Sequence, residues 1–186
     1  MRSDSETVKV PVIAPVRTAS GRVGLALAFA LLVAVSAQIR LPLPFTPVPF
    51  TFQVFIVALA AYQLGAWWGA ASLGLYIGMG AAGAPVFSGG AAGLAALGGV
   101  TAGYLLSYPL AAGIIGWLAS RAQGVGGRVG AGLAGLAVIH AGGVLWMWAV
   151  VPAAPHGTMA LLTWTLLPFV GVDIVKVLVA ERLSRR

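Results

Sequence analysis

The sequence has no cysteine and very little charge. Of its 186 residues, 4 are acidic and 11 are basic, so charged residues make up 8% of the chain, whereas a soluble domain carries roughly 25%. Hydrophobic residues account for 60%, and no charged residue occurs between Arg40 and Arg121 or between Arg128 and Asp173. The absence of cysteine excludes a disulfide and a thiolate metal site. The composition therefore indicates a polytopic membrane protein that forms one domain.

Several catalytic motifs are also absent. The two lysines, Lys9 and Lys176, do not belong to a phosphate-binding Gly-x-x-x-x-Gly-Lys-Ser/Thr loop, so ATP-driven work would require a partner that hydrolyses ATP. Neither His-Glu-x-x-His nor Gly-x-Ser-x-Gly occurs. His140 and His156 have no other metal ligand at suitable spacing, and we interpret them as structural or surface residues. We expect a protein that is not an enzyme and that holds no metal and no cofactor.

The net charge of +7 would be compatible with nucleic acid, but the positions of the basic residues favour a membrane. They gather before the first apolar run, in a short loop bounded by Arg121 and Arg128, and at the carboxyl end. These are the cytoplasmic positions that the positive-inside bias predicts, and Arg40 alone falls on the other side. We expect a lipid bilayer around the protein and no nucleic acid as a partner.

Six apolar runs approach the roughly twenty residues that span a membrane. They cover residues 20–38, 51–64, 69–83, 101–119, 130–151 and 158–180, and the last is expected to bend near Pro168. The predicted fold class is all-α, with six transmembrane helices in one bundle and both termini cytoplasmic. Residues 1–19 are predicted to form a flexible cytoplasmic tail, and residues 20–186 the six-helix membrane domain.

Two segments between these runs have irregular sequences. The stretch RLPLPFTPVPFT, residues 40–51, contains four prolines, which remove backbone donors and forbid a regular helix. It is either an ordinary connector or a loop packed over a site, because irregular backbone near a membrane must be buried in protein or line a wet cavity. The stretch GAPVFSGGAAGLAALGGV is too rich in glycine for a continuous helix.

Asp173 and Lys176 form the one oppositely charged pair deep within an apolar run. They are three residues apart, so on a helix they share a face. Asp173 lies nine residues before Arg182, which corresponds to a depth of roughly 13 Å. Ionisable groups at membrane depth cost several kcal/mol, on the order of 3 kcal/mol each on insertion scales, and mark functional sites. The pair is either a neutralised packing device or a socket for a ligand with both N–H donors and a carbonyl.

Further candidates for ligand contact precede the last span; they are Gln53, Phe87, Ser88, Gly89, Gly90 and Tyr104. Gln53 is equally compatible with a contact between helices. The small residues after Phe87 would let a ligand approach the backbone closely, and the two aromatic rings offer flat apolar surfaces or belong to the core.

The first span repeats alanine at four-residue spacing, at Ala26, Ala30 and Ala34. Small residues at this spacing let two helices approach closely in lipid. The repeat is either a chance result of an alanine-rich helix or a contact with a partner membrane protein.

Together, several segments resemble the BioY family. They are PLPFTPVPFTFQVFIVALA, GAPVFSGGAAGL, TAGYLLSYPLAAGIIGWLA and the final Asp173-x-x-Lys176. This resemblance covers nearly the whole chain after the tail, and its ordered set of motifs is specific. Ala102, where the family pattern has glycine, and Gly171-Val172 before Asp173 depart from it, as do Gly89 and Gly90, where some members carry a polar side chain. These changes affect loop contacts more than the substrate.

The resemblance implies the biotin-binding S component of an energy-coupling-factor (ECF) transporter, in a bacterial cell (inner) membrane. Such a protein captures biotin from the external side and associates with a transmembrane coupling subunit and a pair of ABC-type ATPases. The resemblance assigns biotin contact to Asp173 and Lys176, and the coupling-subunit contact to Ala26, Ala30 and Ala34. It further implies that the proline-rich loop and the Pro85–Gly90 loop close over the site.

The ureido group of biotin has two N–H donors and one carbonyl, which matches the charged pair. Our hypothesis is that Asp173 accepts from the N–H groups and Lys176 donates to the carbonyl. Two other functions remain open at this point. One is a proton-coupled small-molecule carrier that uses Asp173, and the other is an assembly subunit without a ligand.

Overall fold

The computed structural model describes residues 18–151 and 157–185. Most of the predicted tail, residues 1–17, lies outside the described residues, as does His156. The elements follow in chain order as α1 (Ala19–Gln38), β1 (Arg40–Leu43), β2 (Thr46–Thr51), α2 (Gln53–Ala81), the 3-10 turn η1 (Ser88–Gly90), α3 (Gly93–Ala96), α4 (Ala102–Arg121), α5 (Gly124–Val150), α6 (Thr158–Thr165) and α7 (Leu167–Leu183). Helix α1 begins at a side-chain cap, because Thr18 Oγ1 accepts a hydrogen bond from the Gly21 N–H at 3.3 Å.

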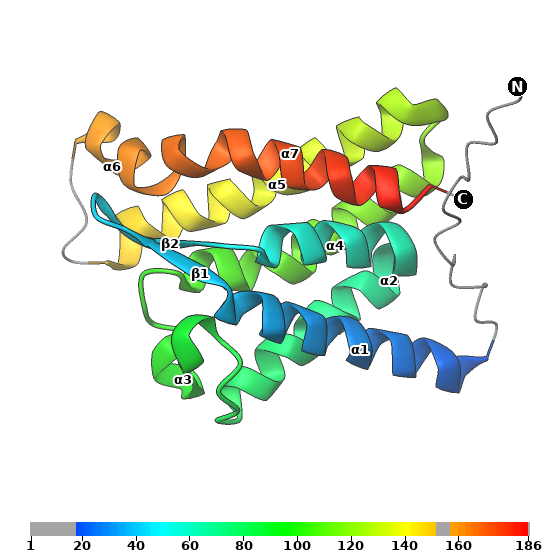
Figure 1. Cartoon of the computed structure of the whole chain (residues 1–186), viewed down its shortest axis with the longest axis horizontal. Coiled ribbons are helices and arrows are strands. Elements are labelled where there is room, and N and C mark those ends of the chain that lie inside the picture. The colour runs from blue at the N-terminus through cyan, green and yellow to red at the C-terminus, as the bar shows by residue number, and fades with distance from the viewer. Residues whose placement is uncertain (1–17, 152–156, 186) are drawn as a thin grey trace, which may run out of the picture.

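The long helices lie side by side, with their loops gathered at two ends (Figure 1). One end holds the start of α1, the α4–α5 connection and the end of α7, and the other holds the β1–β2 hairpin and α6. Arg121 and Arg182 therefore share one end, since they lie in the last turns of α4 and α7. Arg40 begins β1 near the opposite end. The structure thus separates Arg40 from Arg121 and Arg182, and the cytoplasmic side of the latter two stays a prediction.

Within residues 18–151 and 157–185, five helical segments are long and apolar enough to cross a membrane: α1, α2, α4, α5 and Thr158–Leu183, which contains α6 and α7. The protein is thus a mostly helical, multi-pass membrane protein, as predicted. The predicted six separate spans are not matched one to one, because the second and third predicted spans belong to the single element α2. Near Pro168, where the sequence predicts a bend, the helix is interrupted: α6 ends at Thr165 and Pro168 lies in the first turn of α7.

Helix α2 is broken at Gly65, where φ is 77° and ψ is −176°. Only glycine adopts this backbone region readily. The two arms, 53–64 and 66–81, fold back on each other. A hydrogen bond between them shows this: Gln53 Nε2 donates to Tyr76 Oη at 2.9 Å, across 23 residues of sequence. In an unbroken helix these residues would stand roughly 34 Å apart. Helix α4 packs against the break at Gly116, where a Cβ would overlap Ala66. Element α2 is therefore a helical hairpin.

The prediction of an all-α fold needs a correction at the proline-rich segment. This segment forms two antiparallel strands, with Arg40 opposite Thr51 and Leu41 opposite Phe50. The register shifts between Leu41 and Leu43, at a proline that has no N–H for the ladder. Proline is tolerated because both strands are edges of a two-stranded sheet. The segment is thus an ordered hairpin, and the prediction that it contains no regular helix holds.

Two hydrogen bonds with side-chain donors attach this hairpin to distant helices. Thr46 Oγ1 donates to the Trp164 carbonyl of α6 at 2.6 Å, and Lys176 Nζ donates to the Thr51 carbonyl at 2.6 Å. The hairpin is therefore attached to the last two helices at both ends of β2.

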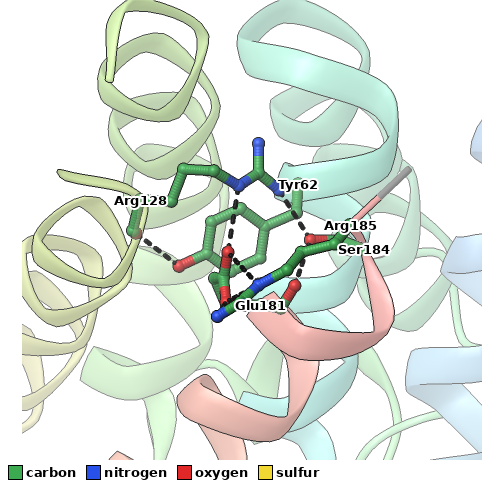
Figure 2. A network of polar contacts seen from close by, with 5 residues as sticks. All are labelled: Tyr62, Arg128, Glu181, Ser184 and Arg185. Atoms are coloured by element: carbon green, nitrogen blue, oxygen red, sulfur yellow. Dashed lines mark hydrogen bonds and ion pairs between the residues drawn. The ribbon is translucent and has the colours of Figure 1, made fainter. Parts of the chain in front are cut away.

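A network of hydrogen bonds and ion pairs lies at the end of the molecule away from this hairpin (Figure 2). Glu181, near the end of α7, is 1% exposed. Its carboxylate accepts from Arg128 Nε at 3.1 Å and from Arg185 Nη2 at 2.7 Å. Arg128 also donates to Ser184 Oγ, and the Tyr62 hydroxyl donates to the Arg128 carbonyl at 2.8 Å. The network joins the first arm of α2, the start of α5 and the end of α7.

Candidate ligand-binding site

The charged pair of α7 is buried and bonded as the sequence predicts. Asp173 and Lys176 are 4% and 7% exposed, and Lys176 Nζ lies 2.7 Å from Asp173 Oδ1. The same ammonium group lies 3.8 Å from the ring centre of Phe50 in β2, a cation–π contact. With the bond to the Thr51 carbonyl and a longer contact to the Phe52 ring at 5.9 Å, the cation has four partners. Lys176 thus links the last helix to the strand that covers it.

A cavity of about 50 Å³ adjoins this pair, between the hairpin and helices α2, α4, α5 and α7. Of the predicted ligand contacts, the residues that line it are Gln53, Ser88, Tyr104, Asp173 and Lys176. Its volume is enough for one or two water molecules and far below the roughly 300 Å³ of the smallest ligand pockets. The cavity brings together side chains from four separate predicted spans and the glycine-rich loop.

The polar groups of Gln53 and Tyr104 both form hydrogen bonds with other residues of the chain. Gln53 donates to Tyr76 and its Oε1 accepts from Thr51 Oγ1 at 3.1 Å. The Tyr104 hydroxyl donates to the Thr165 carbonyl at 2.6 Å, and its ring packs on Gly143, where a Cβ would overlap it. Tyr104 therefore both lines the cavity and packs in the core, and its contact with a ligand stays a prediction.

The glycine-rich loop contributes Ser88 to the cavity but not the other predicted residues. Phe87 is 2% exposed and packs edge-on against Tyr76, with ring centres 5.5 Å apart. Gly89 lies against the Arg40 guanidinium, and the Gly90 N–H donates to Gln38 Oε1 at 3.1 Å. Phe87, Gly89 and Gly90 thus shape the loop, and ligand contact by them stays a prediction that the cavity lining does not support.

The three alanines of α1 pack inside the chain itself. Ala26, Ala30 and Ala34 are 1%, 0% and 8% exposed, whereas Leu27, Leu31 and other large residues of α1 are exposed. Their contact with a partner stays a prediction. In the single chain these alanines instead bring α1 close to its own bundle, mainly to α2.

Sequence reasoning missed His140, which lies in α5 and lines the cavity. Its Nε2 atom lies 3.3 Å from Asp173 Oδ2, and its ring meets Tyr104 edge-on. The contact with Asp173 is within ion-pair distance but not aligned as a hydrogen bond, so both ring nitrogens are buried without a hydrogen-bond partner. The signal for this residue was a lone ionisable side chain in an apolar span, which we had interpreted as structural.

Buried polar atoms without partners concentrate at this cavity. Across residues 18–151 and 157–185 such atoms occur in Ser72, Ser88 and His140, and two of these three residues line the cavity. Buried polar groups are nearly always hydrogen-bonded in native proteins. A water molecule or a polar ligand in the cavity would supply the missing hydrogen bonds. No group of three His, Asp or Glu side chains suited to a metal ion occurs among these same described residues.

Comparisons with known proteins show what this chain is similar to. Residues 7–186 match the BioY family. The biotin transporter BioY of Thermotoga maritima is 38% identical over 158 residues, which cover 85% of this chain and 90% of that protein. The biotin transporter BioY of Rhodobacter capsulatus is 36% identical over 166 residues, covering 84% and 86%.

A solved structure shares the fold. It is the crystal structure of the S-component for biotin from an ECF-type ABC transporter, with a TM-score of 0.79 and 23% identity, covering 91% of this chain and 93% of that chain. The family match extends over nearly the whole sequence, and the two relatives extend over most of it. The chain therefore belongs to the BioY family.

Proposed function

We propose that this chain is the biotin-binding S component of an ECF-type ABC transporter and captures biotin from the external side of the membrane. One observation carries the proposal: a buried Asp173–Lys176 pair adjoins a cavity at the end of the bundle opposite the clustered arginines. By the positive-inside bias, that end faces outward. The names of the relatives as biotin transporters support the choice of ligand.

The chemistry of the pair suits a cyclic urea. Asp173 Oδ2 is an acceptor for a ureido N–H, since Oδ1 already accepts from Lys176. Lys176 already donates to a carbonyl, that of Thr51, and a ureido carbonyl could take the place of that oxygen. Each hydrogen bond to a charged group contributes about 1.5–3 kcal/mol. The rings of Tyr104 and Phe169 in the cavity wall would enclose the apolar bicycle.

Biotin is much larger than the cavity of about 50 Å³, so binding requires part of the wall to move. The hairpin is the segment of the wall attached mainly by side chains, through Thr46 and Lys176. Displacing β2 from Lys176 would enlarge the cavity and release the ammonium group for the ligand.

The proposed topology has six membrane crossings, with the arms 53–64 and 66–81 of α2 each crossing once. These arms are short, and their reversal at Gly65 places the break at the same end as the arginines. Six crossings put the two termini on one side, with residues 1–19 as a cytoplasmic tail. Since the sequence lacks a phosphate-binding loop, a transmembrane coupling subunit and ABC-type ATPases would supply the energy.

Equilibrium binding of labelled biotin to the purified chain in detergent tests this function. We expect saturable binding, weakened about tenfold to a hundredfold in Asp173→Asn and in Lys176→Gln, as follows from losing one charged hydrogen bond. Arg182→Gln is the matched control, since it removes an exposed charge from the same helix, and it should bind like the unsubstituted chain. Wild-type affinity in both site variants would disprove the assignment.

Absence of binding by a folded sample would disprove the biotin function and favour the proton-coupled carrier. Such a carrier predicts uptake that stops with an uncoupler and continues without ATPase partners.

A further inference from the structure

The Pro85–Gly90 loop forms part of the cavity wall, since Ser88 lines the cavity together with Asp173 and Lys176. The side chain of Gln38, the last residue of α1, is bonded to this loop. We propose that Gln38 is a positioning residue that keeps the loop in place as a fixed wall of the ligand site and so slows release of the ligand. This inference rests on the proposed function, because it concerns the same ligand in the same site.

The amide of Gln38 contacts three backbone groups of the loop. Its Nε2 atom lies 3.1 Å from the Phe87 carbonyl and 3.4 Å from the Val86 carbonyl, and its Oε1 atom accepts from the Gly90 N–H at 3.1 Å. The same nitrogen lies 3.2 Å from the Ala34 carbonyl of its own helix, so its two hydrogens are shared among three acceptors. The bonds to the loop join positions 48 to 52 residues apart. They therefore fix the loop relative to α1.

The chemistry of these three contacts calls for an amide. The two carbonyls need N–H donors, whereas the Gly90 N–H needs an acceptor. A carboxylate supplies only acceptors and an ammonium group only donors, but an amide supplies both. The loop also depends on outside support, because Gly89 and Gly90 both have a φ of 75°, and glycine has the widest backbone freedom of any residue. Without Gln38, we expect this backbone to sample other conformations.

Other contacts of the loop differ in what becomes of them when the hairpin moves. The Phe87 ring is buried and occupies the space where a Cβ of Gly80 would stand, which anchors the start of the loop. The Arg40 guanidinium lies against Gly89, but Arg40 belongs to β1, which pairs with the strand that the proposed entry of the ligand displaces. Gln38 belongs to α1, so its bonds remain when the hairpin is displaced. The loop then stays in place, and the ligand has a single route of exit.

The rates of binding and release of labelled biotin test this role. Gln38→Met keeps the length of the side chain without its hydrogen bonds, and Gln38→Glu keeps the acceptor but loses the donors. We expect both variants to release biotin about threefold to tenfold faster, as for one lost hydrogen bond, with association within about twofold. Gln123→Met is the matched control, because Gln123 is exposed and precedes α5 at the opposite end of the bundle; its release rate should not change. An unchanged release rate in Gln38→Met would overturn the proposal.

Hydrogen exchange of the ligand-free chain separates a positioning role from a general loss of stability. In Gln38→Met we expect faster exchange of the backbone amides of residues 86–91 and unchanged exchange in α4 and α5. Faster exchange throughout the bundle would mean that Gln38 supports the fold as a whole, and it would overturn the proposal. A normal release rate in the variants of a chain that binds biotin would refute the role of Gln38 and leave the proposed function intact. An unsubstituted chain that does not bind biotin would refute the proposed function itself.

Discussion

At the scale of single residues, the buried ammonium group of Lys176 links α7 to the hairpin and, under the proposed function, also contacts the ligand. It contacts Asp173, the Thr51 carbonyl and the Phe50 ring. Removing one member of a buried ion pair leaves an uncompensated charge, whereas replacing both members with apolar residues is often neutral. The stability of the fold and the recognition of a ligand can therefore be separated at this pair.

The separation is tested with Lys176→Met, alone and together with Asp173→Val. We expect the single variant to lower the free energy of unfolding by about 3–5 kcal/mol, because Asp173 loses its counter-ion. The double variant should recover most of that loss and yet bind no biotin. Thermal unfolding in detergent and labelled-biotin binding measure the two quantities. A double variant as unstable as the single one would contradict this account.

The site residues that could be identified from the sequence are those whose pattern lies within a few neighbouring positions. The spacing of Asp173 and Lys176 predicts a shared helix face, and the structure confirms it. His140 was missed because its partner lies 33 positions away, on a helix face that the sequence does not reveal. The same reason applies to Ala26, Ala30 and Ala34. Lipid and protein core are both apolar, so the buried side of a membrane helix has no distinct pattern in its hydrophobic residues.

At the scale of elements, the break at Gly65 turns one long helix into two packed arms. The sequence predicted two spans there from length and composition, but it did not identify Gly65 as the turn. The proline-rich hairpin was likewise not predicted as strands, because the bonds that fasten it come from Trp164 and Lys176, more than a hundred residues away. Local sequence thus located these segments without determining their tertiary contacts.

Gly65→Ala tests the importance of the break. A side chain at φ 77° and ψ −176° costs about 1–3 kcal/mol, so we expect a lower unfolding temperature. Gly74→Ala is the matched control, because Gly74 lies in a regular helical arm with open space around its Cβ position. Alanine is favoured over glycine in helices, and this control should be neutral or slightly stabilising. Equal unfolding temperatures for the two variants would contradict the need for glycine at residue 65.

At the scale of the whole molecule, α7 carries two separate polar centres. One is the site at Asp173, and the other is the network around Glu181 (Figure 2). Eight residues separate them along the helix, which corresponds to roughly 12 Å. Next to the first lie buried polar atoms of His140 and Ser88 without hydrogen-bond partners, whereas the carboxylate of the second accepts hydrogen bonds from two arginines. Their roles therefore differ.

Glu181→Gln distinguishes these roles. We expect it to lower the free energy of unfolding by about 1.5–3 kcal/mol, because charged hydrogen bonds to Arg128 and Arg185 are weakened, and to leave biotin affinity within about twofold. Arg121→Gln, which removes an exposed cation stacked on Trp117, should change neither quantity. A large loss of affinity in a folded Glu181→Gln sample would mean that the network acts on the site.

The bond between Lys176 and the Thr51 carbonyl also bears on the speed of capture. A ligand carbonyl that takes over this donor must wait until the strand releases it. Association then has two steps, detachment of the hairpin and entry of the ligand, and at high ligand concentration the first step alone sets the rate. That rate belongs to the protein and is the same for every ligand that fits.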